Sequence, residues 1–253
     1  MGQIFEKKYE LHTYDFDRNG RLKPISLMNY LQDISTVHFE TATAHLPEDV
    51  LGGVWVIVDW QVEIEQTPVH PMTIVVRTEP TYFRKFIAYR RYVAIDAMGN
   101  RVATAISKWA YIDPEQRKQC NIPIILNTIF GVELHAEKPP KMEMRLLTDV
   151  SIQRTERRSA YADIDVNQHV NNVSYLKWTL ESIETAFLNA HTLKSLNLTY
   201  KKEVLEDERV KIETKIKETD GETVSRHDIY SDDMTLCVQV ELIWESAKLK
   251  PNV

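Results

Sequence analysis

The sequence predicts an α+β protein made of two similar halves, each a curled antiparallel sheet wrapped around one long helix. The first observation is a repeated acidic turn, DFDRNG from Asp15 and DIDVNQH from Asp163. The second is a helical pattern after each turn, and the third is a series of alternating strands after each helix. A sheet of this kind has to curl around its helix to cover the helix's apolar face.

The helix pattern is clearest in the second half. Apolar residues step by three and four positions through residues 170–191. They form one face, made of Val173, Leu176, Leu180, Ile183 and Phe187. Asn171 or Asn172 is suited to cap the start of this helix. Residues 24–45 show similar spacing in the first half, with Pro24 in the first turn.

Strict alternation predicts the strands. Residues 54–64 place apolar side chains on one face, and residues 235–245 repeat the pattern. We expect an N-terminal half at residues 1–130 and a C-terminal half, carrying the functional residues, at residues 151–253. The Pro-bearing segment 113–150 has no regular period and is interpreted as a linker that partly packs. Two such halves are expected to pair like the subunits of a homodimer.

The composition excludes several classes of protein. The chain has 253 residues, of which 43% are hydrophobic and 27% charged, as in a folded globular protein. Its net charge of −6 does not favour nucleic-acid binding. Cys120 and Cys237 stand in no spaced motif, which indicates a reduced, cytoplasmic protein without a disulfide framework. No apolar run approaches the ~20 residues of a membrane span, and the N-terminus has no signal-peptide core.

Basic residues nevertheless cluster locally. Arg90-Arg91 and Lys201-Lys202 are two such clusters. Each is interpreted as part of a solvated strand face, and together they offer surfaces for an acidic partner.

The acidic turns do not fit a metal site. The twelfth position of a calcium loop, where a bidentate Glu closes the cage, is Ser26 after the first turn and Leu176 after the second. No paired His or Cys set supplies a transition-metal site. We therefore predict no metal ion and no other cofactor. The first turn, which has Arg21 where the second has His169, is interpreted as a turn and cap ahead of the helix.

The second turn is interpreted as catalytic. Asp165, Asn167 and His169 alternate, so an extended segment would place them on one face, just ahead of a helix N-terminus. A carboxylate, an amide and an imidazole suit attack of water on a carbonyl. The chain contains no GxSxG elbow, and neither Cys lies near a partner His in sequence. Glu203, in a strand predicted at 195–204, is a further acid that spacing alone does not single out.

The segment DIDVNQHVNNVSYLKWTLE, residues 163–181, resembles the signature of acyl-acyl carrier protein (acyl-ACP) thioesterases of plants and bacteria. YKKEV at residues 200–204 resembles the strand that bears a second acid in that family. The resemblance spans nearly the whole chain and implies a tandem hotdog fold. It implies four catalytic residues: Asp165, Asn167, His169 and Glu203. Plant members have a Cys beside that Glu, where this chain has Val204, so a Cys–His–Asn mechanism is not available here.

The resemblance also implies an activity and a partner. Acyl-ACP thioesterases hydrolyse a fatty acyl thioester to free fatty acid and holo-ACP, which ends fatty acid synthesis; the partner is the carrier protein with its phosphopantetheine-linked acyl chain. Glu203, with His169, would activate water as a general base, or Glu203 would form an anhydride as a nucleophile, and the sequence leaves both open. Four side chains in the first half either line an acyl tunnel or pack the core: Met28, Leu31, Trp55 and Trp60.

Two alternatives stay open at this point. One is another hotdog enzyme, such as an acyl-CoA thioesterase or an acyl thioester dehydratase. The other is a non-enzymatic acyl-binding sensor, for which the chain shows no basic DNA-reading stripe. The sequence also leaves open whether the tandem pair forms a further homodimer.

Overall fold

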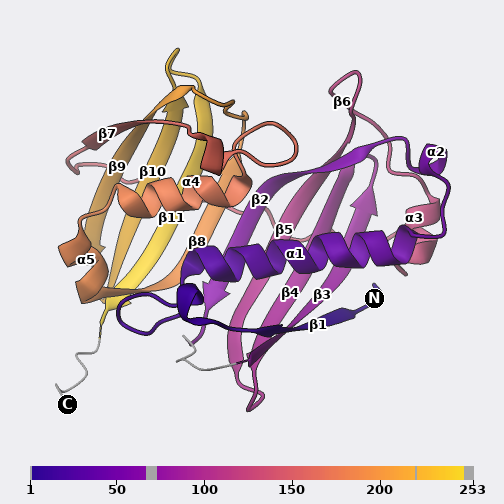
Figure 1. Cartoon of the computed structure of the whole chain (residues 1–253), viewed down its shortest axis with the longest axis horizontal. Helices are drawn as coiled ribbons and strands as arrows, with labels where there is room; N and C mark the ends of the chain where they lie inside the picture. The colour runs from indigo at the N-terminus through magenta and orange to yellow at the C-terminus, as the bar shows by residue number, and fades with distance from the viewer. Residues whose placement is uncertain (1, 67–72, 220, 248–253) are drawn as a thin grey trace. The chain divides into compact units, whose positions relative to one another are not determined.

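The computed structural model describes residues 2–66, 73–219 and 221–247 (Figure 1). The chain divides into two compact units, Met1–Met142 and Glu143–Val253. The outermost residues of the two predicted halves, residue 1 and residues 248–253, lie outside the described part of the chain.

The N-terminal unit is one antiparallel sheet with a long helix against it (Figure 1). The order of its main strands is β1-β3-β4-β5-β2, and a short β6 pairs with β5. The strands are β1 (Phe5–Glu10), β2 (Val54–Ile64), β3 (Thr73–Arg84), β4 (Ile87–Asp96), β5 (Arg101–Asp113) and β6 (Lys118–Gln119). The helices are α1 (Pro24–Thr43), α2 (Glu48–Leu51) and α3 (Ile125–Ile129), with a 3₁₀ turn at Thr13–Asp15.

The C-terminal unit repeats this topology. Its strand order, starting from its first strand, is β7-β9-β10-β11-β8, which matches β1-β3-β4-β5-β2 of the N-terminal unit. In each order the short first strand, β7 or β1, stands at one end, and the first strand after the helices, β8 or β2, stands at the other. The strands are β7 (Gln153–Arg158), β8 (His191–Tyr200), β9 (Arg209–Thr219), β10 (Glu222–Ser231) and β11 (Leu236–Ser246). The helices are α4 (Asn172–Glu181) and α5 (Thr185–Ala190), with a 3₁₀ turn at Tyr161–Asp163. The predicted α+β class is confirmed.

Helix α1 is attached to its sheet by apolar packing and by a polar chain. Its buried face includes Leu31 and Ile34. The hydroxyl of Ser35 lies 2.7 Å from that of Tyr92 on β4, which lies 2.8 Å from the Ser107 hydroxyl on β5. Because all three groups are buried, their mutual hydrogen bonds remove a desolvation cost that unpaired hydroxyls would carry.

The helix of the C-terminal unit is interrupted, which differs from the single long helix predicted over residues 170–191. Helix α4 ends at Glu181. The next N–H, that of Ile183, bonds three residues back to Leu180, and the Ser182 hydroxyl lies 3.1 Å from that of Thr214 on β9. Glu184 has a non-helical ψ of 136°, and α5 starts after it. Phe187, expected on the same helix face as Val173, instead packs edge-on against Trp244, with ring centroids 5.5 Å apart.

Most of the segment at residues 113–150, up to Met142, belongs to the N-terminal unit, and the rest belongs to the C-terminal unit. The segment contains β6 and α3. Leu126, Phe130 and Val132 are buried there in an aromatic cluster with Phe83 of β3. None of the helices among the described residues is both long and apolar enough to cross a membrane.

A buried polar chain runs through the core of the C-terminal unit. His227 on β10 is fully buried, with Nδ1 2.9 Å from the Thr214 hydroxyl and Nε2 3.0 Å from the Ser225 hydroxyl. The indole N–H of Trp244 donates to that same Ser225 oxygen at 2.9 Å. Burial, followed by the charge of Arg226, lowers the pKa of His227 from 6.5 to about 3.

This burial predicts acid sensitivity. The unfolded chain binds a proton on His227 at its ordinary pKa of 6.5, whereas the folded chain resists protonation down to about 3. Stability from this group is therefore complete above 6.5 and is lost as the pH falls through this window. We expect the free energy of unfolding to drop by about 2 kcal/mol between pH 7 and pH 5 from this group alone. Urea titrations at both pH values measure the drop, to which His38, with its pKa lowered to about 4 by burial, also contributes. His227→Gln should reduce the difference by about the 2 kcal/mol expected from His227; an unchanged difference would contradict the assignment.

Candidate active site

The segment that the sequence marks as catalytic is a closed turn ahead of α4. An antiparallel bridge joins Ile164 and Val170. Inside it, the Asp165 N–H donates to the His169 carbonyl at 3.0 Å, and the Gln168 N–H donates to the Asp165 carbonyl at 3.0 Å. The Asp165 carboxylate accepts the Asn167 N–H at 2.8 Å. The expectation of an extended segment is therefore wrong, because Asp165 stabilises a local turn through its own side chain.

The turn still brings Asp165 and His169 close together. It does so because its backbone closes on itself, and not because alternate residues share one face of a strand. The distance from His169 Nδ1 to Asp165 Oδ1 is 3.8 Å, which is too long for a hydrogen bond. His169 Nδ1 is buried and has no hydrogen-bond partner within the described ranges. Asn167 lies exposed at the tip of the turn.

Glu203 lies outside the strand that was predicted to contain it. Strand β8 ends at Tyr200, because the N–H groups of Lys201 and Lys202 both turn to the Cys237 carbonyl, at 2.8 and 3.2 Å. Glu203 therefore stands three residues beyond β8 in an irregular segment and is partly buried.

Backbone hydrogen bonding joins this irregular segment to the turn. The Val170 N–H donates to the Val204 carbonyl at 2.9 Å. His169 immediately precedes Val170, and Glu203 immediately precedes Val204. The structure thus brings the two sequence-predicted segments side by side within the C-terminal unit, although they are more than thirty residues apart.

Helix α4 begins directly after the turn. Asn171 is its N-cap, and its side-chain oxygen accepts the Val173 N–H at 2.9 Å, while its carbonyl accepts the Ser174 N–H at 2.9 Å. These two amides are therefore engaged and not available to polarise a substrate carbonyl. Asn172 is different, because its side-chain oxygen is buried and has no hydrogen-bond partner among the residues described. The sequence analysis indicated Asn172 only as an alternative N-cap of this helix.

Asp163 holds this turn in place from its buried side. Its side chain is only 2% exposed, and it accepts the Ala160 N–H at 3.1 Å and the Trp178 indole N–H at 3.3 Å. Lys177 lies 3.4 Å from the same carboxylate, and Arg157 lies 3.9 Å away while its guanidinium covers the Trp178 ring at 4.6 Å. With this many protein partners, Asp163 serves to hold the turn and α4 in place.

The first-half turn has the same backbone and a different chemistry. Asp17 accepts the N–H groups of Asn19 and Arg21 at 2.8 and 2.9 Å, and a bridge joins Phe16 to Leu22. Gly20 there has φ of 72°, and Gln168 has φ of 65° at the equivalent place in the second turn. Arg21 pairs with Asp17 at 2.9 Å, in the position that His169 holds beside Asp165. This arrangement fits the interpretation of the first half as a structural turn. The expected capping role is not seen, because the N-cap of α1 is Lys23, which makes no side-chain capping hydrogen bond.

The four side chains expected near an acyl tunnel lie in the N-terminal unit. Met28, Leu31 and Trp60 are fully buried core residues, and Trp60 packs against Tyr92 with ring centroids 5.0 Å apart. Trp55 is partly buried and lies in the separate aromatic cluster around Phe130, 4.7 Å from the Tyr111 ring.

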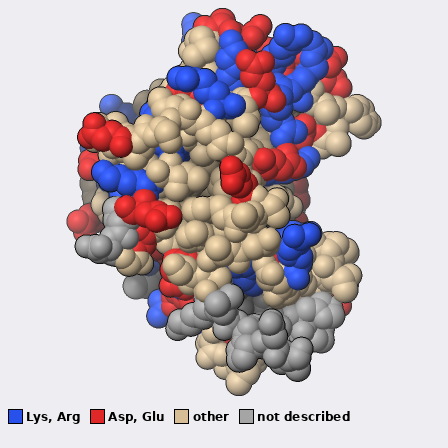
Figure 2. Space-filling model, turned by 90° about the vertical axis from the view of Figure 1, so that its left-hand side faces the viewer, with Lys and Arg blue, Asp and Glu red and all other residues tan. Residues whose placement is uncertain are grey.

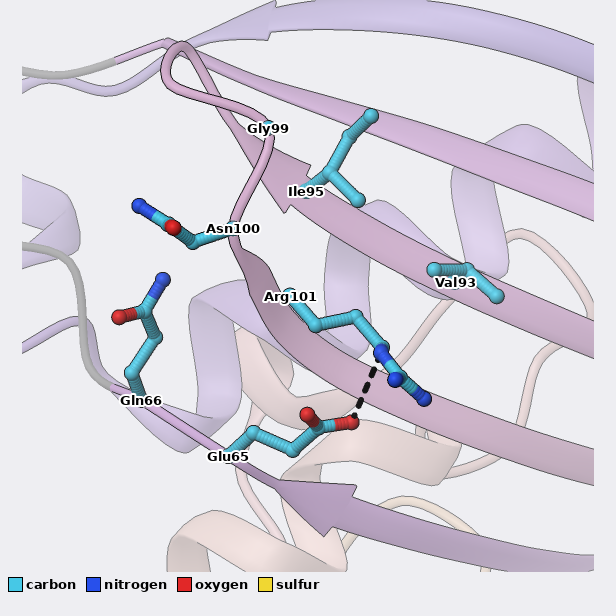
Figure 3. A pocket seen from close by; sticks show the side chains of 7 residues that line it. All are labelled: Glu65, Gln66, Val93, Ile95, Gly99, Asn100 and Arg101. Atoms are coloured by element: carbon cyan, nitrogen blue, oxygen red, sulfur yellow. Dashed lines mark ion pairs between the residues drawn. The ribbon is translucent and has the colours of Figure 1, made fainter.

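The N-terminal unit also has a surface hollow of about 650 Å³ at the β4–β5 hairpin (Figure 3). It is lined by Glu65, Gln66, Val93, Ile95, Gly99, Asn100 and Arg101. Its charged groups are engaged with each other, since Arg101 pairs with Glu65 at 3.4 Å. None of the predicted site residues lines it. Within the described ranges, no three metal-ligating side chains converge.

Sequence models of one family match both units. The model of the acyl-ACP thioesterase N-terminal domain matches residues 2–127, and that of the C-terminal domain matches residues 148–246. The chain belongs to the acyl-ACP thioesterase family. It is 27% identical over 221 residues to the chloroplastic acyl-[acyl-carrier-protein] hydrolase FATB2 of Cuphea viscosissima, and 26% identical over 218 residues to the chloroplastic palmitoyl-acyl carrier protein thioesterase of Arabidopsis thaliana. Each alignment covers 80% of this chain and 52% of the relative, so the chain spans about half the length of these relatives.

Solved structures share the fold. A Lactobacillus plantarum protein provisionally described as an oleoyl thioesterase has a TM-score of 0.85 at 23% identity, covering 98% of both chains. The 12:0-ACP thioesterase of Umbellularia californica has a TM-score of 0.80 at 18% identity, covering 96% of this chain and 98% of its own. At this level of identity the similarity concerns the fold, and it confirms the predicted pair of tandem hotdog halves.

Proposed function

We propose that this protein is an acyl-ACP thioesterase, which hydrolyses a fatty acyl thioester to free fatty acid and holo-ACP and so ends fatty acid synthesis. The observation that carries the proposal is the junction of the 165–170 turn with the 203–204 segment in a chain of this family. Two of its relatives are named as hydrolases or thioesterases of acyl carrier protein.

The proposed reaction is attack of water on the thioester carbonyl. Glu203 acts as the general base, with His169 beside it, and takes a proton from the attacking water. The carbonyl oxygen gains negative charge in the tetrahedral intermediate, and its collapse expels the thiolate of the carrier's prosthetic group, which takes up a proton as free thiol. A thioester is already a reactive acyl donor, so these side chains suffice for the proposal.

The other two residues have orienting roles in this proposal. Asp165 closes the turn and lies 3.8 Å from the His169 imidazole, so its role in the proposal is to orient that ring. Asn167 polarises the substrate carbonyl from the exposed tip of the turn. We also propose that the acyl chain enters the N-terminal unit, near Met28, Leu31, Trp55 and Trp60.

The partner in this proposal is the carrier protein with its phosphopantetheine-linked acyl chain. Figure 2 shows Lys and Arg side chains gathered at one end of the displayed face, with Asp and Glu side chains among them. Lys201 and Lys202, two and one residues before Glu203, are exposed. They are better placed for an acidic partner than Arg90, which is buried and donates to His38 Nδ1 at 2.9 Å. The interpretation of the Arg90-Arg91 cluster as a solvated face is therefore wrong for Arg90.

Two further parts of the proposal concern the setting of the protein. Both Cys120 and Cys237 are free thiols, which supports a reduced, cytoplasmic location. A homodimer of the tandem pair stays a prediction, which the molar mass in solution tests.

The first test is release of free thiol from a long-chain acyl-ACP by the purified chain. We expect rapid, saturable hydrolysis, and faster turnover with acyl-ACP than with the same acyl group on coenzyme A. Preference for the coenzyme A thioester would change the proposed carrier. Saturable acyl binding without thiol release would identify a binding protein, and formation of an unsaturated or hydrated thioester would identify a dehydratase.

A further inference from the structure

Tyr175 on α4 contacts the Glu203 segment through its hydroxyl group. The side chain is buried, and its oxygen accepts the N–H of Val204 at 3.0 Å. The ring is locked by edge-on packing against Trp178, at 5.2 Å between centroids, and against Tyr200, at 6.0 Å. Burial raises the pKa of the Tyr175 hydroxyl, so it stays neutral at physiological pH.

The hydrogen bond acts on the peptide that follows Glu203. The Val204 N–H and the Glu203 carbonyl belong to one planar peptide group, so holding this N–H fixes the backbone orientation at Glu203. The Val204 carbonyl, in the next peptide, accepts the Val170 N–H at 2.9 Å. Val204 is thus held on one side by α4 and on the other by the residue after His169.

Glu203 lies beyond the end of β8, so the hydrogen bonds of that strand do not set its backbone position. Strand β8 has ended at Tyr200, and the neighbouring N–H groups turn elsewhere: those of Lys201 and Lys202 to Cys237, and that of Leu205 to the Glu208 carboxylate at 3.1 Å. In an irregular segment, a specific side-chain contact sets a position that a strand would otherwise set.

We infer that Tyr175 is a positioning residue, whose hydroxyl fixes Glu203 relative to His169 through the peptide of Val204. This inference rests on the proposed function, because it assigns Tyr175 to the same reaction. Tyr175 does not act on the substrate; it keeps the carboxylate where a water molecule between Glu203 and the thioester can lose its proton. A displacement of about 1 Å at such a group is enough to slow catalysis by about 100-fold.

The test is Tyr175→Phe in the full chain, assayed with long-chain acyl-ACP. The variant retains the ring and its packing and removes only the acceptor of the Val204 N–H. We expect kcat to fall by about 10- to 100-fold, with KM changed by less than about threefold, because substrate contacts are retained. The matched control is Thr179→Val, which removes another fully buried hydroxyl from α4, one that donates to the Tyr175 carbonyl at 2.9 Å. It should keep kcat within about twofold of the wild type.

A double-mutant cycle separates positioning from general loosening of the unit. If Tyr175 acts through Glu203, Tyr175→Phe should lower kcat by less than about twofold in a Glu203→Gln background. An equal loss in both backgrounds would overturn the inference, as would an unchanged kcat in Tyr175→Phe. Full activity of Glu203→Gln would also overturn it.

These outcomes differ from failure of the proposed function. If the wild type releases no thiol from acyl-ACP, the proposed function fails. If the wild type is active and Tyr175→Phe behaves like Thr179→Val, the function stands and the inference fails. Thermal unfolding followed by circular dichroism, run on both variants, shows that each comparison is made between folded proteins.

Discussion

Glu203→Gln and His169→Ala are each expected to lower kcat for acyl-ACP hydrolysis by about 100- to 10,000-fold, the range that general acid–base groups supply. Both changes remove a proton acceptor while leaving the backbone bond between Val170 and Val204 intact. The His169 side chain is 33% exposed and Glu203 is partly buried, so neither substitution opens a core cavity. Their free energies of unfolding should therefore lie within about 1 kcal/mol of the wild type.

The measurement is the steady-state rate of thiol release at several pH values, together with a urea titration of each variant. Glu206→Gln is the matched control, because Glu206 is an exposed acid in the turn that follows Glu203. It should leave kcat within about twofold. Near-normal turnover in either main variant would remove that residue from the proposed mechanism, and loss in Glu206→Gln as well would indicate a general charge effect.

The repeat explains how much of this fold the sequence could predict. The strands over residues 54–64 and 235–245 alternate strictly, and the structure has β2 and β11 there within one residue. Pro24 begins α1 and Asn171 caps α4, both at positions that local chemistry indicates. Such features depend on neighbours in the chain, so a single sequence contains the information.

The errors arise where a distant group decides the outcome. Just after the end of α4, the Ser182 hydroxyl contacts Thr214, thirty-two residues away, which no helical period reveals. Strand β8 stops before Glu203 because the Cys237 carbonyl captures two N–H groups. Arg90 is interior because α1 supplies His38 as its partner. Each of these contacts joins separate elements of one unit, and the sequence alone does not say which residues will meet.

The same reason explains which site features could be predicted. The closeness of Asp165 and His169 is local: the segment is not extended, but the turn closes on itself and leaves the two side chains 3.8 Å apart. Tyr175 stands within the quoted signature, four residues after Asn171 on α4, yet its contact with Val204 spans twenty-nine residues. A buried tyrosine at helical spacing is most often a core residue, so nothing in the pattern separates it from its neighbours.

Asp163→Ala is expected to have the largest effect on stability among the residues of the turn. The carboxylate is 2% exposed, and its removal leaves the Ala160 N–H and the Trp178 indole N–H without their acceptor. It also removes the negative charge beside Lys177. Each orphaned donor costs about 1–3 kcal/mol, so we expect the free energy of unfolding to fall by about 2–5 kcal/mol.

A urea titration of Asp163→Ala measures this loss, and Asp165→Ala is the matched comparison two residues away. The Asp165 side chain is 19% exposed and accepts one local N–H in the turn, so its removal should cost about 1 kcal/mol or less while kcat falls steeply. The two aspartates of this short segment would then have different roles, Asp163 in stability and Asp165 in catalysis. Equal stability losses in the two variants would contradict this division, because it depends on the burial and the larger set of partners of Asp163.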